Sequence, residues 1–248
     1  MIYGVEVPGG IGKLKALQTL GVVNIARGNG KATLNELKEL TQLRKLGVSG
    51  VSGKQQGVVV CHCWSQSTSI SVRESVRNLA KLDGSLCEGL LPPSCLESLK
   101  MWGRLVRVTS WIHQLQNLSK LTLERSMLGQ DDAIHALGVL PNLAVLRLKR
   151  WSFDGKQLHF QGSSFPSLVV LELEGLFKLE SVLFEEEAMP RLELLQVDRC
   201  LLKEISGLAV LTSLREVRLG DYVRDALKEK VQRQQVAEHL KHVRVNLS

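Results

Sequence analysis

The sequence predicts an α/β solenoid, a stack of similar coils that each contribute one short parallel strand. Leucine-like residues recur at positions 1, 4, 7 and 9 of a unit, and the unit recurs about every 22–26 residues, a period typical of stacked repeats. Leucine supplies 45 of the 248 residues and aromatic residues only 4%, as expected if similar small apolar slots are filled repeatedly. The eight units begin at Leu14, Leu40, Pro93, Leu115, Leu140, Phe165, Met189 and Leu211.

Each unit pairs an apolar strand side with a polar one. Leu121 and Leu123 alternate with Thr122 and Glu124, and a period of two is typical of a half-buried strand. One unit cannot bury its apolar side alone, so neighbouring units stack, with parallel strands on the concave face and irregular helices and loops on the convex face. We therefore expect a leucine-rich-repeat solenoid, or horseshoe, forming a single domain over residues 1–248 with about eight or nine repeats.

The segments between the strands are expected to differ among repeats. Thr33–Leu43 has the pattern of a helix, capped by Thr33 with Glu36 three residues later in a capping box. Residues 55–91 break the leucine pattern and are expected to hold one degenerate repeat. Within them, Val58–Val60 is a candidate strand and Ser71–Leu82 a candidate helix.

Two later segments lie on the predicted convex side. Asp131–Leu140 is expected to be a short helix whose Ile134, Leu137 and Leu140 face inward. Gly155–Ser164 is expected to be a loop that leads to the next strand.

The turn that leaves each strand has a slot three residues beyond the last strand leucine. Asn or Cys suits such a slot, because its side chain binds backbone groups left unpaired there. Only Ser126 and Cys200 fit that role, and Trp151 is expected to be buried in its slot. The apolar occupants predict an irregular array without a continuous polar ladder. The slots hold Ser126, Trp151, Leu176, Cys200 and Tyr222.

The two ends of the chain differ in character. Residues 224–248 are expected to form a C-terminal cap, with a charged helix over Asp225–Lys241 and a final strand in which Val243, Val245 and Leu247 alternate. Ile2–Ile11 leads into the first repeat without such a cap. We therefore expect the chain to be the C-terminal part of a longer protein.

Charge, hydropathy and cysteine content limit the cellular compartment and the classes of binding partner that we expect. The net charge is +7 and the pI about 9.3, but the basic residues are spread over most repeats, so nucleic-acid binding is not expected. No apolar stretch reaches the length of a membrane span, and the N-terminus lacks the pattern of a secretory signal. Five cysteines without a disulfide-framework spacing favour a reducing, cytoplasmic location, with the nucleus as a further possibility.

Three stretches resemble the repeat domain of plant intracellular immune receptors. They are VPGGIGKLKALQTL at 7–20, ELKELTQLRKLGV at 36–48 and WIHQLQNLSKL at 111–121. The resemblance is to the class with coiled-coil, nucleotide-binding and leucine-rich-repeat modules, especially in cereals. It implies that the chain recognises a pathogen effector or a guarded host protein. It also implies that the domain folds back on the receptor's nucleotide-binding module, which is absent from this sequence, and helps keep the receptor inactive.

A plain intracellular adaptor is the alternative function. The substrate-binding arm of an F-box ubiquitin ligase would share the repeat pattern. Sequence upstream of Met1 would separate the two, because a nucleotide-binding module supports a receptor and an F-box supports an adaptor.

Other motifs are interpreted as structural. Gly9–Lys13 resembles the end of a phosphate-binding loop, but Val7 and Leu14 occupy the positions that need a glycine and a hydroxyl, so a turn is expected. Cys61-His62-Cys63 with His113 lacks the second ligand pair of a zinc site, so ordinary cysteines are expected. No nucleophile–base pattern marks a catalytic group. We expect neither an enzyme nor a bound cofactor or metal.

The polar positions of the strands are the candidate protein-binding residues. They share one predicted surface that carries charges of both signs and a few aromatic side chains, and interfaces favour tryptophan and arginine anchors. These candidates are Arg44, Lys45, Lys100, Trp102, Lys120, Thr122, Glu124, Arg147, Lys149, Glu172, Glu174, Gln196, Asp198, Arg215 and Arg218.

Overall fold

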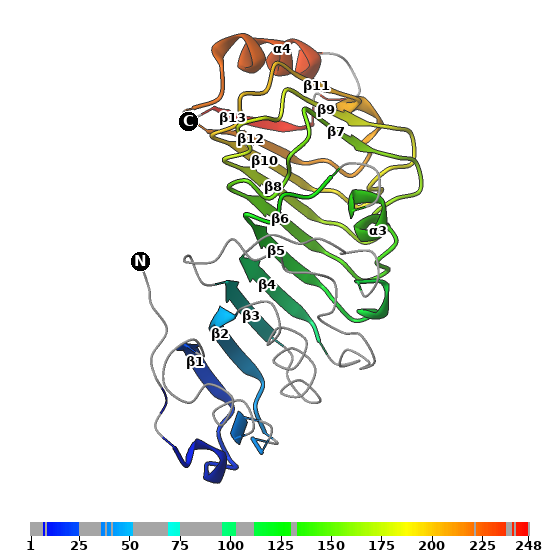
Figure 1. Cartoon of the computed structure of the whole chain (residues 1–248). Helices are drawn as coiled ribbons and strands as arrows, with labels where there is room; N and C mark the ends of the chain where they lie inside the picture. The colour runs from blue at the N-terminus through cyan, green and yellow to red at the C-terminus, as the bar shows by residue number, and fades with distance from the viewer. Residues whose placement is uncertain are drawn as a thin grey trace. The chain divides into compact units, whose positions relative to one another are not determined.

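The computed structural model consists of two compact units, residues Met1–Leu118 and Ser119–Ser248, which we call unit 1 and unit 2 (Figure 1). The structure describes residues 7, 9–24, 36–37, 39–40, 42–51, 69–74, 96–102, 112–129, 133–220, 222–236, 240 and 242–247.

Unit 1 contains a parallel sheet in the strand order β1-β2-β3-β4. Leu20, Leu46, Ile70 and Leu99 pair with one another across these strands, so the same slot of successive repeats forms one row. Short 3-10 helices, η1 and η5, precede strands in two repeats, and residues 36–37 are helical. The elements are η1 Ile11–Lys13, β1 Thr19–Asn24, β2 Lys45–Val51, β3 Ser69–Glu74, β4 Ser98–Trp102 and η5 Ile112–Gln114.

Strand β3 corrects the prediction for the degenerate repeat. The candidate helix Ser71–Leu82 is wrong in its first turn, because Ser71 to Glu74 belong to the strand. Ile70 and Val72 supply the alternating apolar positions, and their β-branched side chains suit a strand better than a helix. The candidate strand Val58–Val60 lies outside the described residues.

The first repeat is less regular than its sequence suggests. Leu14 is exposed although it fills an expected apolar slot, and the pairing of β1 with β2 shifts register between Leu20 and Val22. This shift brings Val23 into the core in place of Val22. The next expected apolar positions, Leu37 and Leu40, are buried as predicted.

Unit 2 is a longer stack of the same kind, with six parallel strands in the order β5-β6-β8-β10-β12-β13 among its described residues. One row of slots runs through the first five strands, and each of its members is at most 1% exposed. The row consists of Leu121, Leu146, Leu171, Leu195 and Val217. The strands are β5 Lys120–Glu124, β6 Val145–Lys149, β8 Val170–Glu174, β10 Leu194–Asp198, β12 Glu216–Leu219 and β13 Arg244–Leu247.

A second parallel sheet, β7-β9-β11, lies at another side of unit 2 (Figure 1). Its strands are β7 Gln157–Phe160, β9 Ser181–Phe184 and β11 Glu204–Ser206. The predicted loop Gly155–Ser164 is therefore wrong, because it contains β7. Phe160 and Phe184 are buried and stacked with ring centroids 5.2 Å apart, and Phe165 meets Phe160 edge-on at 5.6 Å. Such aromatic contacts stabilise the core between the two sheets.

The helices of unit 2 match the prediction in part. Helix α3, His135–Gly138, lies within the predicted range and follows a π-helical stretch at residues 133–134, and Ile134, Leu137 and Leu140 are buried as expected. Asp131 and Asp132, the predicted caps, lie outside the described residues.

Helix α4, Asp225–Val236, and strand β13 lie in the segment for which a cap was predicted. The helix packs against β11 and β13, with Leu227 and Val231 buried and Ala226 exposed. The short η7, Leu208–Val210, precedes β12.

The turns after four strands of the main sheet in unit 2, β5, β6, β8 and β10, share one backbone feature. Arg125, Gly175 and Arg199 follow their strands directly and have positive φ angles of 57°, 65° and 53°. After β6 the positive φ of 61° falls one residue later, on Trp151. In each turn the next residue enters the core, and these buried residues are Ser126, Ser152, Leu176 and Cys200.

This rule overturns the predicted slot of Trp151, and the predicted slot of Tyr222 is wrong as well. Trp151 is 41% exposed because one extra residue after β6 places Ser152 in the core instead. Tyr222 is 70% exposed, and Val223 is buried in its place. Ser126 Oγ is buried without a hydrogen-bonding partner among the described residues, so its predicted backbone contact is not present there.

Candidate functional site

The solvent-facing side of the main sheet of unit 2, which we call the strand face, gathers most of the candidate residues. Side chains alternate along each strand, so the polar positions of neighbouring strands align in rows. One row contains Thr122, Arg147, Glu172, Gln196, Arg218 and Asn246. The next row contains Glu124, Lys149, Glu174 and Asp198.

Three further candidates lie on the sheet of unit 1. Lys45 and Lys100 are exposed, and Trp102 is half-buried. Lys100 pairs with Ser71 of β3, and Trp102 pairs with Arg73 at the end of the same ladder. They share a sheet face with one another.

Two candidates do not belong to the strands. Arg44 lies one residue before β2, and Arg215 lies one residue before β12. Both therefore fall outside the outward-facing rows of the strands. Arg215 instead pairs with Glu193, with Nε and Oε2 3.7 Å apart. Glu216 occupies the outward-facing position at the start of β12 and was missed as a candidate. Its alternation with the apolar Val217 in the sequence could have indicated this position.

An apolar row on the strand face was also missed. Val145, Val170 and Leu194 pair in register and are half-buried. Lys120 of β5 and Glu216 of β12 flank this row on either side. Only polar positions were considered as candidates, although the period of two also assigns these apolar residues to the outer side.

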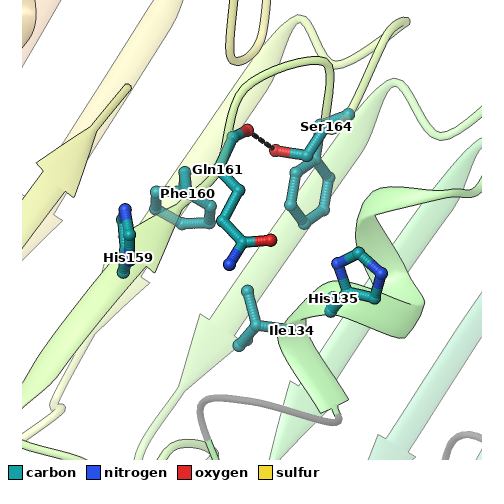
Figure 2. Close-up of a pocket in the computed structure, with 7 residues that line it drawn as sticks. Ile134, His135, His159, Phe160, Gln161 and Ser164 are labelled. Atoms are coloured by element: carbon teal, nitrogen blue, oxygen red, sulfur yellow. Dashed lines mark hydrogen bonds between the residues drawn. The ribbon is translucent and has the colours of Figure 1, made fainter. Parts of the chain in front are cut away.

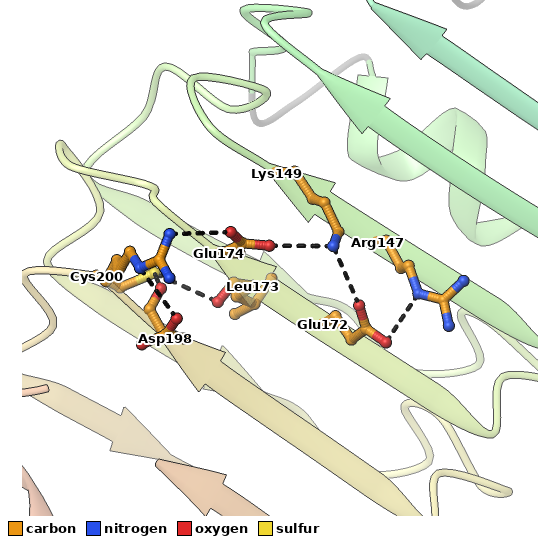
Figure 3. A network of polar contacts seen from close by, with 8 residues as sticks. Arg147, Lys149, Glu172, Leu173, Glu174, Asp198 and Cys200 are labelled. Carbon is orange, nitrogen blue, oxygen red and sulfur yellow. Dashed lines mark hydrogen bonds and ion pairs between the residues drawn. The ribbon is translucent and has the colours of Figure 1, made fainter. Parts of the chain in front are cut away.

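Ion pairs connect the charged residues of the strand face (Figure 3). Arg147 Nε lies 2.8 Å from one oxygen of Glu172, and Lys149 Nζ lies 3.8 Å from the other. The same ammonium group lies 3.0 Å from Glu174 Oε2. Arg199 continues the network with contacts of 3.5 Å to Glu174 and 3.3 Å to Asp198.

This network balances charge within the face. Burial raises the pKa of the Glu174 carboxyl, but the hydrogen bond from Lys149 and the nearby Lys149, Arg199 and Arg150 charges outweigh it, so the pKa is lowered. At neutral pH Glu174 therefore stands as a carboxylate among paired cations. The basic residues at the centre of the face are neutralised locally, although the whole chain carries a net charge of +7.

Cys200 lies beneath the end of the network (Figure 3). Its Sγ contacts the carbonyl oxygens of Leu173 at 3.5 Å and Asp198 at 3.3 Å, so it fills the predicted backbone-binding role. Desolvation by burial raises the pKa of the Cys200 thiol to about 11. A protonated, buried thiol is a structural group and a poor nucleophile at neutral pH.

The glycine-rich turn binds a carboxylate of the chain itself. The N–H groups of Gly10 and Gly12 donate to Glu36 Oε2 at 2.7 and 3.3 Å, and Gly10 has a φ of 94°. The predicted turn is confirmed, and the donors that could meet a phosphate already have a partner. Glu36 therefore has a role other than the predicted capping box, whose Thr33 lies outside the described residues.

Metal and catalytic interpretations gain no support from the described ranges. No group of three or more metal-binding side chains occurs within the part of the chain that the structure describes. His113 is exposed in η5, and Cys61–Cys63, Cys87 and Cys95 lie outside the described residues.

A small pocket of about 290 Å³ lies between α3 and β7 (Figure 2). Ile134, His135 and Phe160 are among its lining residues. His159 also lines it, and its Nε2 lies 2.7 Å from Glu185 Oε1. The imidazole is thus engaged by a carboxylate, and the lining hydroxyl of Ser164 donates to the carbonyl oxygen of Gln161 at 2.5 Å.

Comparison with known proteins places the fold in a family. The family model of the leucine-rich repeat region matches residues 1–246, so the chain belongs to this family. The predicted solenoid class is confirmed.

The curated relatives are plant disease resistance proteins. The chain is 29% identical over 220 residues to the disease resistance protein RPM1 of Arabidopsis thaliana, covering 88% of this chain and 23% of that protein. It is 25% identical over 240 residues to the disease resistance protein Pik-2 of rice, Oryza sativa subsp. japonica, covering 85% and 23%. It is 36% identical over 104 residues to the disease resistance protein RPP8 of Arabidopsis thaliana, covering 41% and 11%. The chain is a leucine-rich repeat region of the kind found in these plant immune proteins.

The chain spans about a quarter of the length of RPM1 and Pik-2, at 23% of each. Across the described ranges, no helix has both the length and the apolar character needed to cross a membrane.

Proposed function

We propose that the strand face binds a protein and that the chain acts as the recognition region of an intracellular plant immune receptor. The ligand would be a pathogen effector or a guarded host protein. The observation that carries this proposal is the half-buried row of Val145, Val170 and Leu194 beside rows of paired charges.

This combination suits a protein partner. Protein interfaces place an apolar centre inside a polar rim, and isolated charges are depleted at the centre. The apolar row supplies the centre, and Lys120 and Glu216 stand at its two ends. The pairing of Arg147 and Lys149 with Glu172 argues against a nucleic-acid ligand, because phosphate binding needs cations that are available to the phosphates.

Signalling by such a region would depend on differential binding. The same surface would contact the nucleotide-binding module of the full receptor in the inactive state, and the ligand would compete for it. A ligand shifts this equilibrium only to the extent that it binds one state better than the other. The chain itself would catalyse no reaction, and its place of action would be the cytoplasm. The names of the relatives favour this function over an F-box adaptor.

The test is capture of a partner from pathogen-challenged plant tissue by wild-type and variant chains. Leu194→Ser removes an apolar side chain from the face, and Arg147→Glu reverses a charge in the adjacent row. Val139→Ser is the matched control, because Val139 is an apolar residue that is 56% exposed after α3, away from the strands. Circular dichroism melting verifies that all three variants fold.

We expect the captured protein to be lost with Leu194→Ser and Arg147→Glu and kept with Val139→Ser. A partner that all folded variants retain would show that the strand face is not the binding surface.

A further inference from the structure

Unit 2 exposes large apolar side chains at the ends of its strands. Among the described residues, seven large apolar side chains are exposed, and four of them follow β6, β8, β10 and β12 in successive repeats. We call these four the strand-end ridge: Trp151, Phe177, Leu201 and Tyr222.

Neighbouring members of the ridge lie close together. The rings of Trp151 and Phe177 have centroids 5.2 Å apart, about the spacing of adjacent strands. Phe177 and Leu201 line the same hollow. The guanidinium carbon of Arg199 lies 5.8 Å from the ring centroid of Tyr222. Trp151, Phe177 and Leu201 therefore form a continuous feature across adjacent repeats, and Tyr222 extends it through its contact with Arg199.

The exposure is built into the turns. The core positions beside the ridge are already filled by Ser152, Leu176 and Cys200. Trp151, Phe177 and Leu201 therefore have no core position left to occupy. Trp151 is 41%, Phe177 42% and Leu201 46% exposed. Contiguous apolar surface of this kind, rimmed by polar groups, marks an interaction site.

The hollow beside the ridge has a surplus of positive charge. It has a volume of about 490 Å³, and four basic and two acidic residues line it with Phe177 and Leu201. Both carboxylates are paired: Asp154 with Lys178 at 2.5 Å, and Glu180 with Lys203 and with Lys156 at 3.4 Å. Arg224 is exposed at the same hollow.

This surplus of positive charge indicates which kind of partner segment the hollow would bind. Apolar side chains of a partner would cover Phe177 and Leu201, and carboxylates next to them would meet the surplus cations. A second copy of the chain that docked by a two-fold contact through the same ridge would bring two hollows with a positive surplus together. The carboxylates of Asp154 and Glu180 inside the hollow also disfavour a continuous anionic lipid surface.

We propose that the strand-end ridge is a second protein-binding surface, which takes an acidic segment of a partner protein with apolar side chains between its carboxylates. It is separate from the strand face, where the charges balance. The two surfaces could thus bind different parts of one partner or two partners.

The test measures fluorescence anisotropy of a dye-labelled peptide in which leucine and tryptophan alternate with glutamate. One comparison peptide replaces glutamate with lysine, and another replaces leucine and tryptophan with serine. We expect the full chain to bind the first peptide about tenfold or more tightly than either comparison peptide, and more weakly as salt is raised.

Variants assign the binding to the ridge. The double variant Phe177→Ser/Leu201→Ser and the single variant Arg224→Glu should each weaken binding of the acidic peptide by about tenfold. Val139→Ser removes an equally exposed apolar side chain elsewhere and should leave binding unchanged. Leu194→Ser, on the strand face, should also leave it unchanged, so failure here is distinct from failure of the proposed function. Arg224→Glu keeps the test decisive if the double variant does not fold.

Three results would overturn the proposal. The first is equal binding of the acidic and basic peptides, or binding that survives both ridge variants. The second is sedimentation showing self-association of the chain that the ridge variants abolish, which would make a second copy the occupant. The third is ridge-dependent binding to vesicles of anionic lipid without binding of the peptide.

Discussion

The two sides of the main sheet in unit 2 are formed by the same strands but follow different constraints. On the inner side, Leu146, Leu171 and Leu195 stand in one row, and each is fully buried. On the outer side, the adjacent row places Arg147, Glu172 and Gln196 in the same register. Each inner residue packs on its counterparts in the coils before and after it, so one residue type recurs. The outer residues meet solvent, so their identity is available for recognition.

The sharpest test of this comparison uses two adjacent residues of β8. Leu171→Ala should lower the free energy of unfolding by about 2–5 kcal/mol, because it leaves a cavity between two packed repeats. The matched control, Glu172→Ala, should cost about 1 kcal/mol or less, because its ion pairs remain partly hydrated. Urea unfolding of the whole chain measures both. Equal losses would mean that the two sides are not distinct.

Close packing in the interior should restrict the backbone as well as the side chains. Gly207 has a φ of 81°, and a Cβ there would lie 2.1 Å from the carbonyl oxygen of Phe184. Gly207→Ala should therefore cost about 2 kcal/mol or more in thermal or urea unfolding. Gly220→Ala is the control, because its Cβ would meet the Asp198 carboxylate, which can rotate away. A harmless Gly207→Ala would show that the turn before η7 adapts freely.

On the outer side of the sheet, we expect substitutions to change the free energy of unfolding less, and we expect the change to depend on pH. The folded-state pKa of Glu174 is lowered from its usual value of 4.5, so its ionised form stabilises the fold. Glu174→Gln should cost about 1 kcal/mol or less at neutral pH. The difference from wild type should be full above pH about 4.5 and should disappear as the pH falls through the lowered pKa. Urea midpoints at a series of pH values measure this difference, and a constant difference at all pH values would contradict the assignment.

One interior substitution should raise stability. Ser152 Oγ is buried without a hydrogen-bonding partner among the described residues, which is an unfavourable place for a hydroxyl. Ser152→Ala should raise the free energy of unfolding by about 1 kcal/mol. Differential scanning calorimetry would show a higher melting temperature, whereas a lower one would mean that the hydroxyl has a partner that stabilises the fold.

The inner rows were predictable from sequence, because a leucine at fixed spacing can be recognised without its neighbours. Strand β3 was missed because Ile70 and Val72 replace the leucines, and β7 was missed because Leu158 and Phe160 alternate over only a few residues. The apolar row with Val145 was passed over because its residue types resemble those of the core. Polar candidates such as Thr122 and Glu172 were correctly placed on the outer side of the strands, whereas Arg44 and Arg215 were misplaced by one residue.

The exposure of Trp151 was not predictable from the repeat count, because it depends on where the chain turns. The left-handed residue occurs one position later after β6 than after β5, β8 and β10. Fixed spacing assigned Trp151 to the core, whereas the backbone assigned Ser152. The strand-end ridge could therefore be recognised only from the three-dimensional structure.

The extra residue after β6 leaves the sheet undisturbed, since Leu146 still pairs with Leu171. The bend at the strand ends thus tolerates changes in chain length. A gene of this family could gain or lose a codon there, exchange a small side chain at the surface for a large aromatic one, and still encode a stable scaffold. Diversification of the outer rim would then proceed by small insertions as well as by substitution.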